Sequence, residues 1–333
     1  MRHPIYWLWG MLGIVVFSAT VFAQTSATTP AQQDERVVVG TNLVTLNVIV
    51  TDRDGRYVKG LTRNQFELYD EKTKQNIAHF SADASPVSLG IVLEVHENSE
   101  KTRAMLAAIK EFTSTLNDRD DFFFVAFSKD GSVTTEFIPS VDQLENHLKF
   151  VKPGRPAALY DTLYLAAERL QKKNNLTKAL LVISDGQDEQ SRHSYKELRN
   201  RLRTFDVQVY AIGIADPATD PFAGYGRWVF EDITRLSGRR SFLMNSDSAM
   251  GRGVLAEMSR VSGGTTYIPE TESEPELTGI CTQIAFELRQ QYTLGFYSRD
   301  AGDGRWRRLK VLVTSPKSGL RLSYREGYLS SGR

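Results

Sequence analysis

The chain has 333 residues, of which 41% are hydrophobic and 24% charged, and its formal net charge is +1. This length permits a substantial core and more than one domain, and the ordinary balance of apolar and charged residues excludes a disordered chain. The near-neutral charge gives no reason to expect a nucleic-acid binder, and we interpret two short basic clusters, at 199–203 and 305–310, as solvated faces of a helix and a strand.

Residues 1–23 have the pattern of a secretory signal peptide. A short basic start precedes an apolar segment from Ile5 to Phe22, and Ala23 offers a cleavage point before Gln24. The segment is long enough to span a membrane, so an uncleaved anchor is the alternative. We therefore expect an exported chain, periplasmic or secreted, that contacts a membrane only if the segment is retained. Residues 24–36, rich in Thr, Ala, Ser and Gln, are expected to form a flexible linker.

The single cysteine, Cys281, excludes an internal disulfide. An exported chain of this kind must therefore rely on its hydrophobic core, which its length permits. Cys281 falls on one face of a helical pattern with Leu277, Ile284 and Leu288, so we expect a buried side chain rather than a reactive thiol.

Residues 37–84 predict a small β module. Val37 to Val50 alternates apolar and polar residues, which is typical of a half-buried strand. The turn signal Asp52-Arg53-Asp54-Gly55 predicts a hairpin into residues 56–59. Two further short strands are expected at 66–69 and 76–80.

Residues 85–290 change to alternating strands and helices. Apolar strands are expected at 88–93, 121–127, 179–184 and 207–214, with a shorter antiparallel edge strand at 133–138. Helical patterns lie around 105–116, 158–170 and 195–202. This succession predicts an α/β fold with a doubly wound, mainly parallel sheet and helices on both faces.

The last third of the chain contains a weak duplication and a second β region. Residues 230–238 resemble 255–263, and each copy predicts a short helix that ends at a glycine before a strand; one is expected to be an inserted helix–strand unit near 216–250. A final helix at 274–290 precedes β segments at 292–297, 305–313 and 320–324. Because these segments cannot easily extend a parallel sheet, residues 291–328 are expected to pair with the N-terminal β module.

Polar residues follow the first apolar strand of the α/β region. Glu94, His96 and Asn98 come directly after this strand, and Asp185 ends a later one. In doubly wound sheets the loops at the carboxyl ends of the strands form the binding crevice. We therefore place the functional region here.

Three segments in this order resemble the metal-binding loops of a von Willebrand factor type A (VWA) domain: Glu94 to Asn98, Ala157 to Asp161 and Leu181 to Gly186. The match is closer to a secreted bacterial branch, the VWFA-related domain proteins known from acidobacteria, because residues 48–66, 288–297 and 324–328 look similar to its flanking signatures. The resemblance covers about residues 37–328. It implies a Rossmann-like sheet, an adhesion or protein-binding role and a crest that usually holds Mg²⁺.

The positions that correspond to the family's metal ligands have changed. The first loop of the family reads Asp-x-Ser-x-Ser, and the matching residues here are Glu94, His96 and Asn98; the Thr of its second loop corresponds to Ala157. Only the third-loop Asp is retained, as Asp185. Mg²⁺ prefers oxygen ligands in tight octahedral geometry, whereas an imidazole suits Zn²⁺ or similar ions.

Three interpretations of this crest follow. It is a degenerate site whose polar residues cap the sheet, an altered divalent-cation site with Glu94, His96 and Asp185 as ligands, or a metal-free surface where Glu94, His96, Glu97 and Asp188 contact a protein partner. The third is compatible with the first. We assign no cofactor and expect a partner-binding crest made of the degenerate positions Glu94, His96, Asn98, Ala157, Asp185 and Asp188.

Common catalytic signatures are absent from the sequence. It contains no phosphate-binding glycine loop, no H-E-x-x-H and no G-x-S-x-G. The carboxylates of 185–189 suit a helix start, where Ser191 is the expected N-cap. We therefore predict a non-catalytic exported module; the alternative is a hydrolase or other metal-dependent enzyme that uses Glu94, His96 and Asp185.

Overall fold

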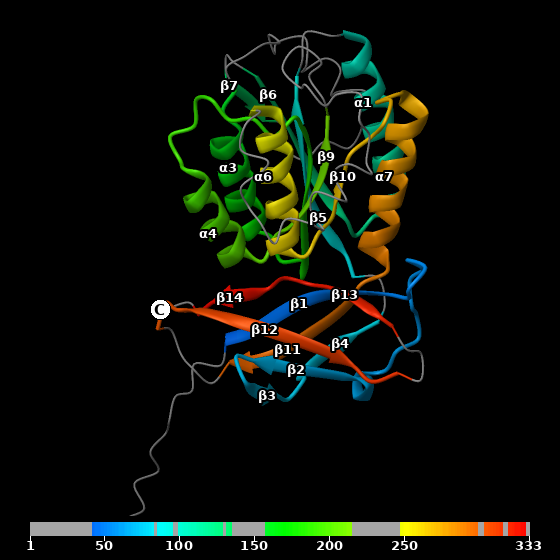
Figure 1. Ribbon diagram of the computed structural model, residues 1–333, viewed down its shortest axis with the longest axis vertical. Helices are drawn as coiled ribbons and strands as arrows, with labels where there is room; N and C mark the ends of the chain where they lie inside the picture. The colour runs from blue at the N-terminus through cyan, green and yellow to red at the C-terminus, as the bar shows by residue number, and fades with distance from the viewer. Residues whose placement is uncertain are drawn as a thin grey trace, which may run out of the picture. The chain divides into compact units, whose positions relative to one another are not determined.

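The computed structural model describes residues 42–82, 85–95, 99–128, 131–134, 157–214, 247–298, 303–315 and 319–330. The predicted signal peptide, the linker and most of the predicted insertion lie outside these residues. Within them the chain forms an α/β sheet with covering helices and a pair of four-stranded antiparallel sheets (Figure 1). No helix in the described ranges is both long and apolar enough to cross a membrane.

The α/β sheet has six strands in the order β10-β9-β8-β5-β6-β7. Their bounds in this order are Thr266–Tyr267, Gln208–Gly213, Thr177–Ser184, Val87–Glu94, Asp121–Ser128 and Gly131–Thr134. All pair in parallel except β7, which lies antiparallel on the edge beside β6. Every residue of β5 is buried, as its apolar sequence predicts for a central strand that is covered on both faces. The predicted doubly wound, mainly parallel sheet is therefore confirmed.

In the described part of the chain, five helices cover this sheet, two on one face and three on the other (Figure 1). They are α1 (Ser99–Ser114) and α7 (Glu274–Arg289) on the first face, and α3 (Leu159–Gln171), α4 (Tyr195–Phe205) and α6 (Asp247–Ser262) on the second. Cys281 is fully buried in the core under α1 and α7, and burial raises the pKa of its thiol to about 12. The expectation of a buried cysteine side chain is confirmed.

The two antiparallel sheets combine strands from both ends of the chain. One has the order β13-β1-β11-β4 and the other β14-β12-β2-β3. Their bounds are Arg321–Ser323, Asn42–Thr51, Tyr292–Ser298 and His79–Ser81 in the first, and Gly327–Leu329, Trp306–Val313, Phe66–Asp70 and Thr73–Gln75 in the second; a short 3₁₀ helix, Arg63–Gln65, precedes β2. A single apolar core joins them as a β sandwich. The expected pairing of the C-terminal segments with the N-terminal module is confirmed.

Some local predictions differ from the structure. The turn at Asp52 forms, with the Asp52 carboxylate accepting the N–H of Arg56 at 2.9 Å, but the predicted return strand is only an isolated bridge between Thr51 and Tyr57. Strands β3 and β14 were not expected because three residues are too few to show a period. Residues 255–263 do end a helix, and Gly263 at φ +84° precedes β10; the matching copy at 230–238 lies outside the described residues.

The amino ends of the parallel strands face the β sandwich. Asp206, just before β9, accepts hydrogen bonds from Thr45 Oγ1 at 2.9 Å and pairs with the Arg325 guanidinium at 3.1 Å. Thr45 belongs to β1 and Arg325 follows β13, so both contacts join the sandwich to the α/β domain. The carboxyl ends of the same strands therefore point away from the sandwich (Figure 1).

Asp120 joins the start of the central strand, β5, to the last helix, α7. Its carboxylate accepts the N–H groups of Val87 and Asn117, each at 2.8 Å, and pairs with both terminal nitrogens of Arg289. Burial alone would raise the pKa of Asp120, but the Arg289 guanidinium and the backbone donors outweigh it and hold the pKa below its ordinary value.

We expect acid to remove the contribution of Asp120. A carboxyl whose folded-state pKa is depressed stabilises the protein fully above its unfolded-state pKa, and this stability is lost as the pH falls through the lower, folded-state value. Asp120→Asn should therefore reduce the free energy of unfolding at pH 7 and leave a shallower loss of stability below about pH 4. Urea titrations of both proteins between pH 2 and 7 measure this, and parallel curves would contradict it.

Candidate functional site

The crest of the parallel sheet is built around a buried carboxylate. Glu94 ends β5 and is only 3% exposed. Its Oε2 atom accepts hydrogen bonds from Ser184 Oγ at 2.7 Å and from the N–H of Asp185 at 3.2 Å. Ser184 Oγ in turn accepts the N–H of Gly186 at 2.9 Å. Glu94 therefore joins the ends of the two neighbouring strands β5 and β8.

The loop after β8 turns sharply against helix α6. Asp185 is 1% exposed, and its Oδ1 atom accepts the N–H of Gln187 at 2.9 Å. Gly186 has φ +81°, and a Cβ placed on it would lie 2.1 Å from the carbonyl oxygen of Gly251. Only glycine fits here without displacing the backbone of α6. The Asp185-Gly186 turn is thus fixed by packing as well as by hydrogen bonds.

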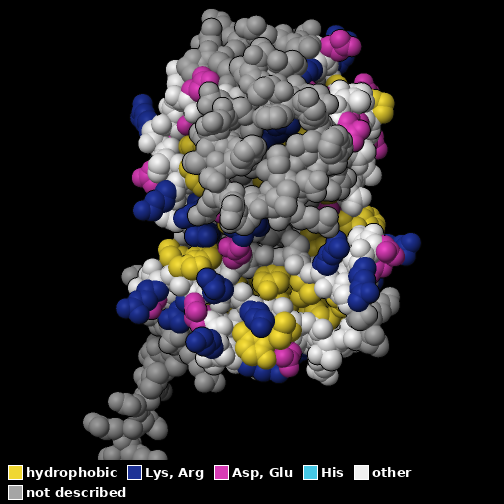
Figure 2. Space-filling model, in the orientation of Figure 1, with side chains coloured by type: hydrophobic (Ala, Val, Ile, Leu, Met, Phe, Trp, Pro, Cys, Tyr) yellow, Lys and Arg dark blue, Asp and Glu magenta, His cyan; other side chains and the backbone are white. Residues whose placement is uncertain are grey.

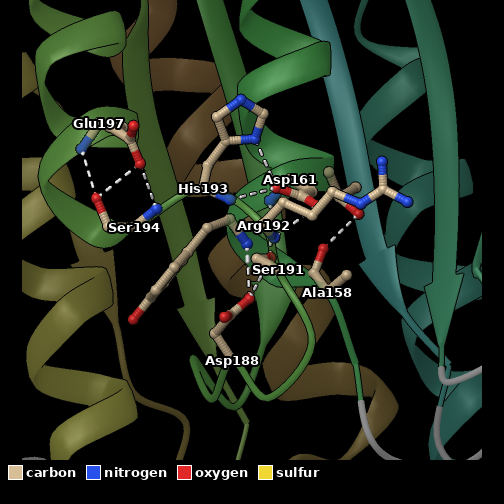
Figure 3. A network of polar contacts seen from close by, with 10 residues as sticks. Ala158, Asp161, Asp188, Ser191, Arg192, His193, Ser194 and Glu197 are labelled. Carbon is tan, nitrogen blue, oxygen red and sulfur yellow. Dashed lines mark hydrogen bonds and ion pairs between the residues drawn. The ribbon is translucent and has the colours of Figure 1, made fainter.

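The start of α3 holds the rest of this loop. The carbonyl of Ala157 accepts the N–H groups of Glu189 and Gln190, at 3.0 and 3.3 Å. Asp188 Oδ1 accepts the N–H of Tyr160 at 3.0 Å and the hydroxyl of Ser191 at 2.5 Å (Figure 3). Ala157 therefore contributes a backbone acceptor instead of the family's hydroxyl, and Asp188 acts as a cap for the first turn of α3.

Asp161 and His193 complete this network, and sequence reasoning missed their pairing. Asp161 accepts the N–H groups of Arg192 and His193 at 3.0 and 2.9 Å, and its Oδ1 lies 2.6 Å from His193 Nδ1 (Figure 3). Burial would raise the pKa of Asp161, but these backbone and ring donors lower it below its ordinary value. The His193 ring stacks on Tyr164 with a centroid separation of 4.0 Å.

The expected N-cap of α4 was wrong. Ser194, not Ser191, caps the helix: its hydroxyl accepts the N–H of Glu197 at 3.3 Å, and the Glu197 carboxylate accepts the N–H of Ser194 at 2.7 Å. The capping box Ser-x-x-Glu in the sequence was the signal that could have identified it. Ser191 instead accepts the N–H of Asp161 at 2.9 Å, so it ties the loop to α3.

The structure brings only some of the predicted site residues together. Glu94 and Asp185 meet at the ends of β5 and β8, and Ala157 and Asp188 hold the third loop against α3. His96, Glu97 and Asn98 lie outside the described residues. Among the residues described, no group of three or more His, Cys, Asp or Glu side chains is placed to hold a metal ion.

Two of the described positions differ from the Mg²⁺ site that the resemblance implies. Glu94 Oε2 already accepts two protein donors, and Ala157 has no side-chain oxygen. Octahedral coordination by oxygen ligands needs several such atoms turned toward one point. At this crest Glu94 Oε2 and Asp185 Oδ1 each accept hydrogen bonds from the protein itself.

Residues 95–224 match the sequence model of the von Willebrand factor type A domain. The matched residues include strands β6 to β9 and helices α1, α3 and α4 of the structure described above. The chain therefore carries a VWA domain, joined to a β sandwich. A comparison with curated proteins found no match.

Several solved structures are similar to the chain at low sequence identity. An aerotolerance-related membrane protein from Bacteroides fragilis is 13% identical with a TM-score of 0.40, over 61% of this chain and 98% of that one. The pilus adhesin SpaC from Lactobacillus rhamnosus GG is 9% identical with a TM-score of 0.44, over 83% and 50% of the two chains. A von Willebrand factor type A protein from Catenulispora acidiphila is 10% identical with a TM-score of 0.39, over 86% and 74%.

Proposed function

We propose that this chain is an exported, non-catalytic interaction module of the VWA type, and that it binds a protein partner at the crest of its parallel sheet without using the family's Mg²⁺ site. The observation that carries the proposal is the hydrogen bonding of Glu94. Its carboxylate is committed to Ser184 and Asp185, so it holds the crest loops together by itself.

The shape of the crest supports a recognition surface that is fixed before binding. The loop from Asp185 to Ser194 is held by Ala157 and Asp161, which accept four of its backbone N–H groups, and by its own Asp188, which accepts the N–H of Tyr160 on α3. A surface that is ordered in the free protein loses less conformational entropy when a partner binds. Glu94 and Asp185 are buried at the base of this loop, whereas Glu189 and Gln190 are exposed on it.

The placement of the crest also supports binding to a partner. Because the sandwich contacts the amino ends of the strands, it leaves the carboxyl ends facing away from it (Figure 1). The binding crevices of doubly wound sheets lie at the carboxyl ends. Export is proposed from the apolar segment at residues 5–22 and its expected cleavage before Gln24.

We expect the immobilised mature chain to capture one partner from a cell-envelope extract, equally well in EDTA and in Mg²⁺. Glu189→Arg should weaken capture at least fivefold because it reverses a charge on the exposed part of the crest loop. Quantitative immunoblotting or mass spectrometry of the retained partner measures the effect. The control is Asp54→Arg, which makes the same charge reversal in a distant turn of the sandwich.

Three results would contradict the proposal. Release of the partner by EDTA would show that a divalent cation takes part in binding. Tight calorimetric binding of Mg²⁺ that disappears in Asp185→Ala would do the same, because Asp185 is the retained residue of the family's ligand set. Equal capture by Glu189→Arg and Asp54→Arg would place the binding surface elsewhere.

A further inference from the structure

A groove lies between helix α6 and the β sandwich, at the opposite end of the sheet from the crest. Its volume is about 730 Å³, and it is open to solvent. Residues of α6, β10, β12 and β13 line it, among them Arg260, Thr266, Arg308, Leu322 and Glu326. A smaller cavity of about 210 Å³ adjoins it and shares Thr265, Leu322 and Ser323.

The first side of the groove is an open sheet edge, β13. Among the described strands it is the edge of its sheet and pairs with β1 alone, where Leu322 stands opposite Val50. The Val50 carbonyl accepts the N–H of Val58 on the far side of β1. Opposed residues of an antiparallel pair turn their backbone groups either both inward or both outward. The N–H and C=O of Leu322 therefore point away from β1, along the open edge.

The second side is also an open edge, that of β10 in the parallel sheet. The N–H of Ala211 on β9 donates to the carbonyl of Thr265 at 3.0 Å. Alternate residues of a parallel strand bond to the same neighbour, so the next residue, Thr266, turns its N–H and C=O away from β9. Leu322 and Thr266 are both half-buried, and both line the groove.

The charges around the groove favour an acidic ligand. Glu326, the one acid in the described lining, is paired with Arg260, which also binds Glu257 at 2.8 Å. Arg308 is exposed and makes no side-chain ion pair with the described part of the chain. The adjoining cavity adds the exposed Arg321 and one acid, Glu287, which is 6% exposed and accepts the hydroxyls of Thr265 and Tyr267. Basic side chains also gather along this boundary on the face seen in Figure 2.

We propose that this groove binds an extended, acidic segment of a partner polypeptide, which adds a strand to the open edge of β13 or β10 and pairs its carboxylates with Arg308 and Arg321. Unpaired edge strands are natural templates for strand addition, in which backbone bonds supply affinity and side-chain sites supply specificity. Folded chains protect such edges by charge or cover, and here the exposed charged residues of the described lining are all arginines. An extended acidic segment can pair its backbone with the open edge and its carboxylates with the arginines.

This groove is independent of the crest. It lies at the amino ends of the strands and contains none of the residues from Glu94 or the 185–194 loop. Capture of a partner at the crest can therefore fail while the groove still binds its segment, and the reverse is also true. The two proposals are separated by variants of Glu189 and Arg308.

The test uses three fluorescein-labelled peptides of eight residues, with alternating Glu-Thr, Lys-Thr or Glu-Pro sequences. The full mature chain should bind the Glu-Thr peptide in fluorescence anisotropy, and the Lys-Thr peptide at least tenfold more weakly. The Glu-Pro peptide keeps the negative charge but lacks every second N–H, so it should also bind at least tenfold more weakly. NMR should show slowed amide exchange at Leu322 or Thr266 when the Glu-Thr peptide is bound.

Arg308→Glu should weaken binding of the Glu-Thr peptide by about tenfold, because it reverses a charge that faces the ligand. Lys310→Glu is the matched control: Lys310 is an exposed base on the same strand outside the groove, and its variant should bind within twofold of wild type. Circular dichroism confirms that both variants fold. The proposal would be overturned if the Glu-Thr peptide did not bind at millimolar concentration, if the Glu-Pro peptide bound equally well, or if the two variants had equal effects. It would also be overturned if sedimentation showed a dimer in which a second copy of the chain fills the groove.

Discussion

Gly186→Ala is expected to lower the free energy of unfolding by about 3–5 kcal/mol, since it combines a strained backbone with a steric clash. Gly186 has φ +81°, which an alanine adopts only under strain, and the new Cβ would lie 2.1 Å from the Gly251 carbonyl oxygen in α6. The atom that must move is backbone, so relief requires a shift of the helix itself. Urea denaturation followed by circular dichroism measures the loss.

Gly60→Ala is the matched control for this variant. Gly60 has nearly the same backbone angle, φ +76°, but no atom lies within 4 Å of the position of its added Cβ. It should lose only about 1 kcal/mol, the cost of the backbone conformation alone. The difference between the two variants isolates the contact between the Asp185-Gly186 turn and α6; similar losses would refute that contact.

The second large effect is expected at the junction between the two parts of the chain. Asp206→Asn should cost about 2–3 kcal/mol because it leaves the Arg325 guanidinium, whose side chain is 8% exposed, without its counter-ion. Asparagine tolerates the left-handed conformation of Asp206, φ +53°, so the substitution removes charge with little change in backbone preference.

The double variant Asp206→Asn with Arg325→Met tests the cause of this loss. The second substitution removes the unpaired Arg325 charge, so the double variant should be more stable than the single variant Asp206→Asn. The control Asp54→Asn breaks an exposed pair with Arg56 at 3.2 Å and should leave the unfolding midpoint unchanged. If Asp206→Asn is as harmless as Asp54→Asn, the buried pair does not stabilise the junction.

The elements with a clear period could be predicted from the sequence. The apolar run that forms β5 has no polar interruption until Glu94, and the stripe through Met105, Ile109 and Phe112 fits one helical face. Three-residue strands such as β14 carry no such period. Their existence depends on partners far along the chain: β14 pairs with β12, and β12 with β2 across more than 230 residues.

The position of the candidate site could be predicted from the sequence, but the hydrogen bonds between its side chains could not. The resemblance located Glu94 and Asp185 at the ends of adjacent strands, and the structure places them there. That Glu94 accepts the Ser184 hydroxyl is a contact across 90 residues of sequence, which depends on the register of two strands and on two rotamers. No local pattern encodes this. Asp161 and His193 were missed for the same reason.

The pairing of β1 has a consequence for the order in which the chain assembles. Both of its neighbours, β11 and β13, come from the last 42 residues, and the whole α/β domain lies between β4 and β11 in the sequence. Of the described strands, β1 is thus synthesised first and gains its sheet neighbours only after the α/β domain has been made. The α/β domain, whose contacts are more local, can fold earlier. The β sandwich is completed after the α/β domain and joins the segments that precede and follow that domain in the sequence.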